Sequence, residues 1–462
     1  EDIRKIKKID IFCLKGTGKM KVIKLIAALL AIMPLAGCVG NEPNDAVYIV
    51  AMGFDKAQDG SDNYEITIQF AKPTEISGGA SESGGKGGSD IIENIVVNAP
   101  SIYAGINTAN HIVSKKFSLF HSKLFVFSSE VAQEGIADLL ETMSRSEEIR
   151  ADVYMAVSRG RANEYLTEVK PVVELNPAKY YQLTYDENDA DGFPRCTLLE
   201  FAFLENVDYA DIAVPVAGVM DGGSLEENGE TSQDEESSGG EEESKKSDDS
   251  NSQNENSAEK NVPLNESGFE FKTKNYIAGQ VAVQEVNKSE TMGMGIFRNE
   301  KLVAILGEKE SVLYNILKGD YRSSYITFRE KKDSDKPVTL KIAQRKRPMI
   351  KIDKDNKKVR IRLYLEADFY SVSADYNIEK RIAEFEGETK KEINSACEEF
   401  IKSVRDNYGS DIVGIGLEAK KLFWTNKEFE EYNWREKFSE YDISVDTDFK
   451  IRRTGLTMRE KE

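Results

Sequence analysis

Among the side chains that could do chemistry in this sequence, the thiol of Cys38 has the most informative surroundings. It follows Leu35-Ala36-Gly37, and further upstream lie a basic segment that begins at Met20 and an uncharged apolar run, Leu25–Met33. A basic start, a short apolar run and small residues before a cleavage point are typical of a secretory signal peptide. The apolar run is shorter than the ~20 residues that a membrane-spanning helix needs. We therefore expect residues 20–37 to be a cleaved signal peptide.

The tetrapeptide Leu35-Ala36-Gly37-Cys38 resembles the lipobox of bacterial lipoproteins. The resemblance implies that diacylglycerol is joined to the Cys38 thiol through a thioether, and that cleavage then leaves Cys38 at the N-terminus, open to a further N-acyl chain. Two or three acyl chains hold a protein stably at a membrane, whereas one chain binds only marginally. Because Met20 starts a complete signal peptide, we interpret residues 1–19 as upstream translated sequence or a mis-set start.

The other residues that could act as nucleophiles, bases or metal ligands are few. Cys196 and Cys397 lie far apart and in no CxxC motif, which argues against a disulfide framework and against a zinc site. His111 and His121 are the only histidines, and neither has a Ser, Cys or Asp partner at a recognisable spacing. We predict no catalytic residues, no metal and no cofactor apart from the covalent lipid on Cys38.

The charge of the chain is strongly negative but unevenly spread. The formal net charge is −19, which argues against a nucleic-acid partner. Residues 221–260 alone contribute −11, which leaves −8 for the rest. Residues 221–261 contain almost no apolar side chains, and we expect a disordered acidic insert. Residues 77–90 are rich in Gly and Ser but lack the ending of a phosphate-binding loop, so we expect a flexible insert there too.

The first half of the mature chain alternates between strand and helix patterns. Apolar residues over 47–53 and alternating residues over 64–70 predict an antiparallel hairpin. Helical spacing predicts a helix from Ile102, capped by Ser101, and a second helix over Val131–Ser144. We place His111 on the first of these helices, beside apolar residues.

The second half contains one long helix among strands. Pro215 suggests an edge position for the strand over 213–219, and Gly319 is placed to end a helix over 309–317. The basic run 341–358 alternates with apolar residues, so we interpret it as the solvent face of strands rather than a nucleic-acid or lipid-headgroup patch. Residues 377–407 predict a long helix whose apolar stripe contains Cys397 as a core thiol.

These patterns indicate the α+β class, with three mixed domains that each combine a mostly antiparallel or mixed sheet with packed helices. We place an N-terminal domain at 38–195, a small middle domain at 196–330 and a C-terminal α+β domain at 331–460. The flexible insert 77–90 falls in the first domain, and the acidic insert 221–261 falls in the second.

Short motifs are spaced along the mature chain. In chain order they are 51–56, 64–73, 121–126, 135–140, 145–150 and 157–162, and after the long helix come Ser410-Asp411-Ile412-Val413-Gly414-Ile415-Gly416 and Trp434. From the residue types alone, Asp411 is better interpreted as a helix cap or turn residue than as a catalytic acid. In their order and spacing these motifs resemble the Ger(x)C family, the C-subunit lipoproteins of spore germinant receptors, whose Ser-Asp-x-x-Gly-x-Gly turn is similar to 410–416 and whose tryptophan fits Trp434.

The resemblance implies a non-enzymatic receptor subunit on the outer face of the spore inner membrane. It also implies assembly with membrane-spanning A and B subunits and a part in nutrient-triggered germination. Two alternatives remain open from the lipobox alone. A lipid-anchored solute-binding protein of a transporter would need two similar lobes around a cleft. A lipid-anchored envelope hydrolase would need paired carboxylates or a triad, and no such motif stands out.

Overall fold

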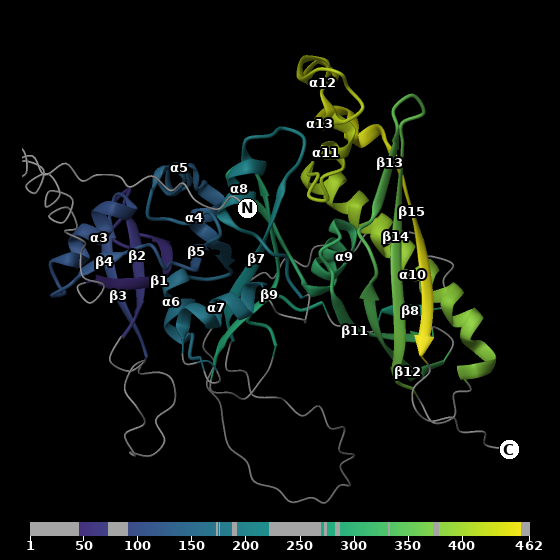
Figure 1. The fold of residues 1–462 in the computed structure, drawn as a ribbon, viewed down its shortest axis with the longest axis horizontal. Helices are drawn as coiled ribbons and strands as arrows, with labels where there is room; N and C mark the ends of the chain where they lie inside the picture. The colour runs from purple at the N-terminus through teal and green to yellow at the C-terminus, as the bar shows by residue number, and fades with distance from the viewer. Residues whose placement is uncertain are drawn as a thin grey trace, which may run out of the picture. The chain divides into compact units, whose positions relative to one another are not determined.

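The computed structural model describes residues 46–72, 91–171, 174, 176–186, 192–220, 269–271, 275–281, 287–330, 333–372 and 378–453 (Figure 1). The expected leader and signal peptide over 1–37, the lipobox with Cys38, and the inserts 77–90 and 221–261 lie outside these residues. None of the described helices is long and apolar enough to span a bilayer.

The first sheet has nine strands and mixed direction. Its order is β10-β9-β7-β6-β5-β1-β2-β3, with β4 paired to β1. The central strands β1, β5, β6 and β7 run parallel, whereas β2, β3, β9 and β10 pair antiparallel. The bounds are β1 (Ala46–Lys56), β2 (Tyr64–Ala71), β3 (Ile92–Ala99), β4 (Lys116–Ser118), β5 (Leu124–Ser128), β6 (Tyr154–Ser158), β7 (Ile212–Val219), β9 (Ser289–Arg298) and β10 (Lys301–Leu306).

Helices cover both faces of the first sheet, as they must for buried parallel strands. One core joins the sheet to α3, α4, α5 and α8, and a second core on the other face joins it to α6 and α7. The bounds are α3 (Ile102–Asn110), α4 (Ser129–Glu134), α5 (Ala137–Arg145), α6 (Ala162–Glu168), α7 (Pro177–Asp186) and α8 (Leu198–Glu205).

The second sheet is built around the long strand β14. One edge of β14 pairs antiparallel with β12 and β13, and the other edge pairs in parallel with β15. The strand order is β13-β14-β12-β11-β8, with β15 on the far side of β14. The bounds are β8 (Phe269–Phe271), β11 (Ser323–Glu330), β12 (Asp333–Gln344), β13 (Met349–Asp353), β14 (Lys358–Ser371) and β15 (Asp442–Arg453).

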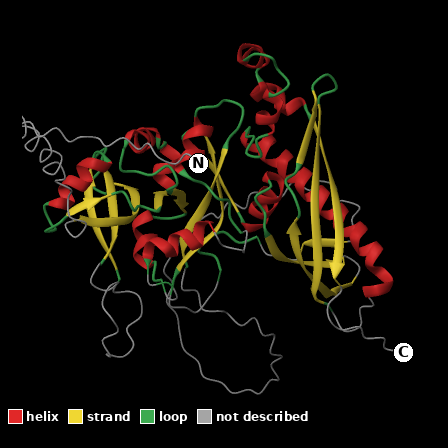
Figure 2. Ribbon diagram, in the orientation of Figure 1, coloured by secondary structure: helices red, strands yellow, loops and turns green. Residues whose placement is uncertain are grey.

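The helix α10 (Ile378–Tyr408) lies along one face of the second sheet (Figure 2). Its predicted stripe is buried, and Cys397 is fully enclosed, so burial raises the pKa of that thiol. In the basic run 341–358, Lys346 and Lys351 are exposed while Ile342 is buried and Ile352 is partly buried. The predicted solvent face of the basic run is therefore confirmed. The remaining helices are α9 (Glu308–Lys318), α11 (Ile415–Lys420), α12 (Asn426–Tyr432), α13 (Trp434–Lys437) and the 3-10 helix η4 (Phe438–Glu440).

The α+β class is confirmed. The strands of the predicted middle domain, 196–330, divide between the two sheets, because β7, β9 and β10 belong to the first and β8 and β11 to the second. One hydrophobic cluster also includes Met294 of β9, Leu317 of α9 and Leu363 of β14, so the two sheets share core residues. The domain boundaries themselves stay a prediction.

Several local predictions are confirmed. β1 and β2 form the antiparallel hairpin. The Ser101 hydroxyl accepts from the Ala104 N–H at 3.3 Å and caps α3. Gly319 ends α9 in the left-handed region with φ +85°, which glycine adopts without steric cost.

Three local predictions are wrong. The helix expected over Val131–Ser144 is divided into α4 and α5 at Gly135, whose φ of +123° is incompatible with a continuing helix. Pro215 lies in an interior strand between β6 and β9, at an irregularity in the pairing that tolerates its missing N–H. His111 does not lie on the helix among apolar residues but is the exposed C-cap residue that follows α3.

Two of the motifs noted in the sequence, 51–56 and 157–162, meet where β1 ends and α6 begins. The buried Asp55 carboxylate accepts from the N–H groups of Ala162 and Asn163, both at 2.8 Å. Burial raises the pKa of Asp55, while these two N–H groups and Arg161 lower it. Gly53 lets α6 approach the sheet, because a Cβ there would lie 3.0 Å from Leu166 Cδ1. Motif 51–56 therefore caps α6 through Asp55 and lets α6 pack closely through Gly53, and motif 157–162 leads into the first turn of α6.

We predict that Asp55→Ala lowers the free energy of unfolding by roughly 2–4 kcal/mol, because it leaves the N–H groups of Ala162 and Asn163 without their acceptor. Urea unfolding of the mature chain measures the loss. Asp59→Ala is the matched control, since Asp59 only bonds Ser61 in an exposed turn. Equal losses in the two variants would contradict the role assigned to Asp55.

Candidate functional site

Two loops that are about 200 residues apart in sequence meet at a pair of buried aspartates. Asp211, just before β7, accepts through Oδ2 from the Ser410 hydroxyl and from the Asp411 N–H, both at 2.9 Å. The Asp211 N–H in turn donates to the Asp411 carbonyl oxygen at 3.0 Å. The loop leading into the first sheet is thereby hydrogen-bonded to the turn that follows α10.

Arg435 supplies the positive charge at this junction. Its guanidinium group binds both carboxylate oxygens of Asp211, at 2.9 Å from Nη2 and 3.3 Å from Nη1. Its Nε donates to the Asp208 carbonyl oxygen at 2.7 Å. Since the Asp211 side chain is only 1% exposed, this two-point ion pair compensates a charge that would be costly to bury alone.

The Asp411 carboxylate accepts four hydrogen bonds and holds the start of α11. Oδ1 accepts from the N–H groups of Gly414 and Ile415 at 3.0 Å each, and Oδ2 accepts from Gly416 N–H at 2.6 Å and from Trp434 Nε1 at 3.3 Å. Burial raises the pKa of Asp411 to about 6; the N–H donors act against that shift and the Asp211 charge adds to it. The prediction that Asp411 is a helix-cap or turn residue is confirmed.

The two glycines of this turn are needed for different reasons. Gly414 has φ +80°, in the left-handed region. A Cβ on Gly416 would lie 2.0 Å from the Tyr209 carbonyl oxygen and 2.7 Å from Trp434 Nε1. The residues of the Ser-Asp-x-x-Gly-x-Gly motif thus allow the 409–416 turn to pack closely against the 206–211 loop.

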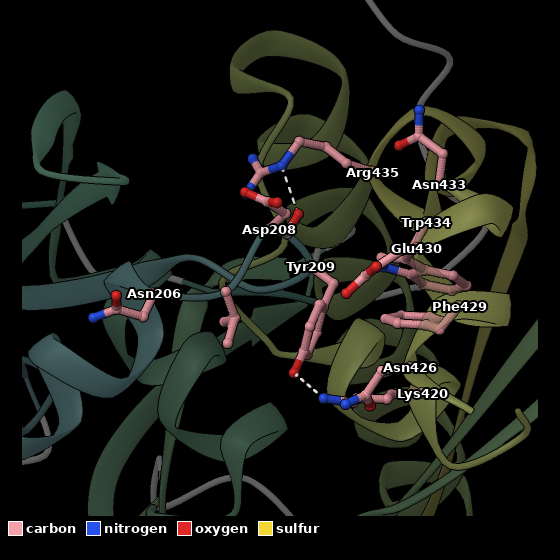
Figure 3. Close-up of a pocket in the computed structure, with 11 residues that line it drawn as sticks. Asn206, Asp208, Tyr209, Lys420, Asn426, Phe429, Glu430, Asn433, Trp434 and Arg435 are labelled. Atoms are coloured by element: carbon pink, nitrogen blue, oxygen red, sulfur yellow. Dashed lines mark hydrogen bonds between the residues drawn. The ribbon is translucent and has the colours of Figure 1, made fainter. Parts of the chain in front are cut away.

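Beside this junction is a pocket of about 300 Å³ (Figure 3). Its aromatic wall is formed by Tyr209 and Phe429, whose ring centroids are 5.0 Å apart, and Lys420 Nζ donates to the Tyr209 hydroxyl at 2.8 Å. The pocket combines an aromatic surface with donors and acceptors of both charges, which suits a small polar molecule or a loop of a partner protein. Its lining residues are Asn206, Val207, Asp208, Tyr209, Lys420, Asn426, Phe429, Glu430, Asn433, Trp434 and Arg435.

A second pocket, of about 360 Å³, lies at the carboxyl ends of β6 and β7. Arg159 and Arg161 line it, but Arg161 pairs with Glu65, and Arg159 donates to the Ala278 carbonyl oxygen at 3.3 Å. These contacts assign both arginines to structural roles.

The structure does not bring the other chemically capable residues together. Burial raises the pKa of the Cys196 and Cys397 thiols, and both are free. His111 and His121 are exposed, and His121 packs its ring against Tyr48 at 4.3 Å. Within the described ranges, no three His, Cys, Asp or Glu side chains are grouped as metal ligands. The predicted attachment site Cys38 lies outside these ranges.

Comparisons with known proteins agree on one family. Residues 40–219 match the model of the spore germination protein N-terminal domain, and residues 292–455 match the model of the spore germination B3/GerAC-like C-terminal domain.

A curated relative and a solved structure are similar to the chain. The relative is YfkR of Bacillus subtilis (strain 168), a protein named for spore germination, which is 25% identical over 163 residues. That match covers 35% of this chain and only 41% of YfkR. The crystal structure of the GerBC protein is similar at 14% identity with a TM-score of 0.47, covering 87% of this chain and 96% of that chain.

The raised pKa of Asp411 leads to a pH-dependent prediction. The folded-state pKa of about 6 exceeds the ordinary 3.8, so the folded state binds more protons in this window and gains stability as pH falls. The difference in unfolding free energy between the wild type and Asp411→Asn should therefore grow by about 1 kcal/mol from pH 7 to pH 5. Urea titrations at both pH values measure it.

Ser410→Ala is the control for this experiment, because it removes a donor to Asp211 without removing a titratable group. Its stability loss should be the same at the two pH values. A wild-type advantage over Asp411→Asn that shrinks on acidification would contradict the burial of this carboxyl group.

Proposed function

Since this chain belongs to the Ger(x)C family of spore germination proteins, we propose that it is the lipid-anchored C subunit of a germinant receptor. In this role it assembles with membrane-spanning A and B subunits on the outer face of the spore inner membrane and takes part in nutrient-triggered germination. The observation that carries the proposal is the match to both family domains in their order along the chain, at 40–219 and 292–455.

The candidate site supports a role as one mechanical unit. Asp211 belongs to the first matched region, and Asp411 and Arg435 belong to the second. Their buried hydrogen bonds and ion pair join the two regions directly. A partner that binds one region would therefore also constrain the other, which suits a subunit that orients or clamps membrane-spanning partners.

The proposed role needs no catalysis. The Asp411 carboxylate, whose pKa burial raises to about 6, accepts from four N–H donors, and both described thiols are buried. The chain would instead act through proximity, because an acylated Cys38 would concentrate its folded part at the membrane that contains the partners.

The experiment that tests this proposal is affinity capture of a tagged copy from solubilised membranes of dormant spores, followed by mass spectrometry. We expect two multi-spanning proteins to be recovered with the chain. Recovery of a transporter permease and an ATPase would favour a solute-binding protein instead, and absence of the chain from spores would overturn the proposal.

Replacing the acylated residue tests the anchor separately. Cys38→Ala should move the protein from the membrane fraction to the soluble fraction and weaken nutrient-triggered germination, because no thioether can form. Gly37→Ala is the matched control, since it keeps a small residue before the cysteine. It should leave membrane association and germination unchanged. Membrane retention and normal germination of Cys38→Ala would count against the anchor.

A further inference from the structure

One turn of the second matched region presents a tryptophan almost entirely to solvent. Trp424 is 97% exposed, the highest value for any large apolar side chain among the described residues. Leu422, two residues earlier, is 44% exposed. The other tryptophan, Trp434, is only 3% exposed. We call residues 421–425, between α11 and α12, the Trp424 turn.

The Trp424 turn is held in place from its inner side. The Thr425 hydroxyl caps α12 by accepting from the Glu428 N–H at 3.2 Å, and the Glu428 carboxylate accepts from the Trp424 N–H at 3.1 Å. The Phe423 ring packs against Phe429 and also against Tyr432 at 5.1 Å. The backbone of Trp424 is therefore fixed while its indole stays outside, so little conformational entropy is lost when the indole binds.

The surroundings of the indole are charged and polar rather than broadly apolar. Lys421 and Lys427 have side chains that are 67% and 83% exposed, and each is paired with a glutamate on its own helix or turn. Lys354, from the β13–β14 hairpin, lies 5.1 Å from the Phe423 ring centroid. A tryptophan that anchors a protein–protein interface is normally surrounded by a well-packed patch. Trp424 has lysines near it in place of a well-packed apolar patch.

An isolated tryptophan flanked by lysines fits the interface of a lipid bilayer. The indole ring is stable at headgroup depth, and lysine side chains lay their apolar stems along it while their charges reach the lipid phosphates. Because the lysines here are largely balanced by nearby glutamates, the indole and Leu422 supply most of the attraction. Binding should therefore depend weakly on salt.

We propose that the Trp424 turn is a second membrane contact, at which Trp424 and Leu422 enter the headgroup region of a bilayer. The inference rests on the proposed function in one respect, namely that the anchor at Cys38 brings a bilayer within reach. One tryptophan and one leucine bind a bilayer weakly by themselves, but a tether converts their binding into an intramolecular step.

The experiment uses the mature chain with Cys38→Ser, tethered through an N-terminal histidine tag to nickel-chelating lipid in phosphatidylcholine–phosphatidylglycerol vesicles. This tether replaces acylation, so the result is independent of the anchor and of any receptor partner. We expect the tryptophan emission to shift to shorter wavelength on tethering, and brominated lipids to quench it. Trp434 is buried and should not respond, which assigns the signal to Trp424.

Substitutions then separate the lipid contact from its alternatives. Trp424→Ala should abolish the shift and lower the vesicle partition of the untethered chain about tenfold. Tyr370→Ala, which removes a 59% exposed aromatic ring on β14, should leave partition unchanged. An unshifted emission from the tethered chain would overturn the proposal. So would a shift that persists in Trp424→Ala, or one that requires added spore membrane proteins.

Discussion

The junction between the two matched regions depends on the burial of two neighbouring carboxylates, those of Asp211 and Asp411. Asp211 and Asp411 are both nearly inaccessible to water, and like charges at such proximity repel strongly in a low-dielectric setting. The structure compensates them separately, with Arg435 and Ser410 on Asp211 and four N–H donors on Asp411. Each donor comes from a fixed position, so the junction is stable only when both loops are in place.

The same constraint explains why small residues are concentrated in the 409–416 turn. The Tyr209 carbonyl oxygen and the Trp434 indole occupy the space that a side chain at residue 416 would need. Trp434 therefore has two roles: its indole leaves no room for a side chain at residue 416, and its Nε1–H donates to the Asp411 carboxylate. The motif is better understood as the shape of an internal contact than as a catalytic or ligand-binding signature.

Sequence patterns could predict the elements whose stabilisation is local. The cap by Ser101, the end of α9 at Gly319 and the buried stripe around Cys397 each follow from residues within a few turns of one another. The hydrogen bond between Asp211 and Asp411 could not be predicted, because the local sequence around either residue does not indicate a contact with a residue 200 positions away. The predictions of one continuous helix across Gly135 and of an edge strand at Pro215 failed for a related reason. In both places tertiary pairing outweighed the local preference of the residues.

The parallel pairing of β14 with β15 has a consequence for the order of folding. The partner of Lys358 is Asp442, so the edge of β14 stays unpaired until α10 and the helices after it have been synthesised. Contacts between residues this far apart in sequence are slow to form, because a long loop must close first. If the chain crosses a membrane before it folds, the backbone N–H and C=O groups on this edge of β14 stay unpaired during that interval. Such an edge is where non-native pairing starts, and a chaperone that shields extended segments would act there.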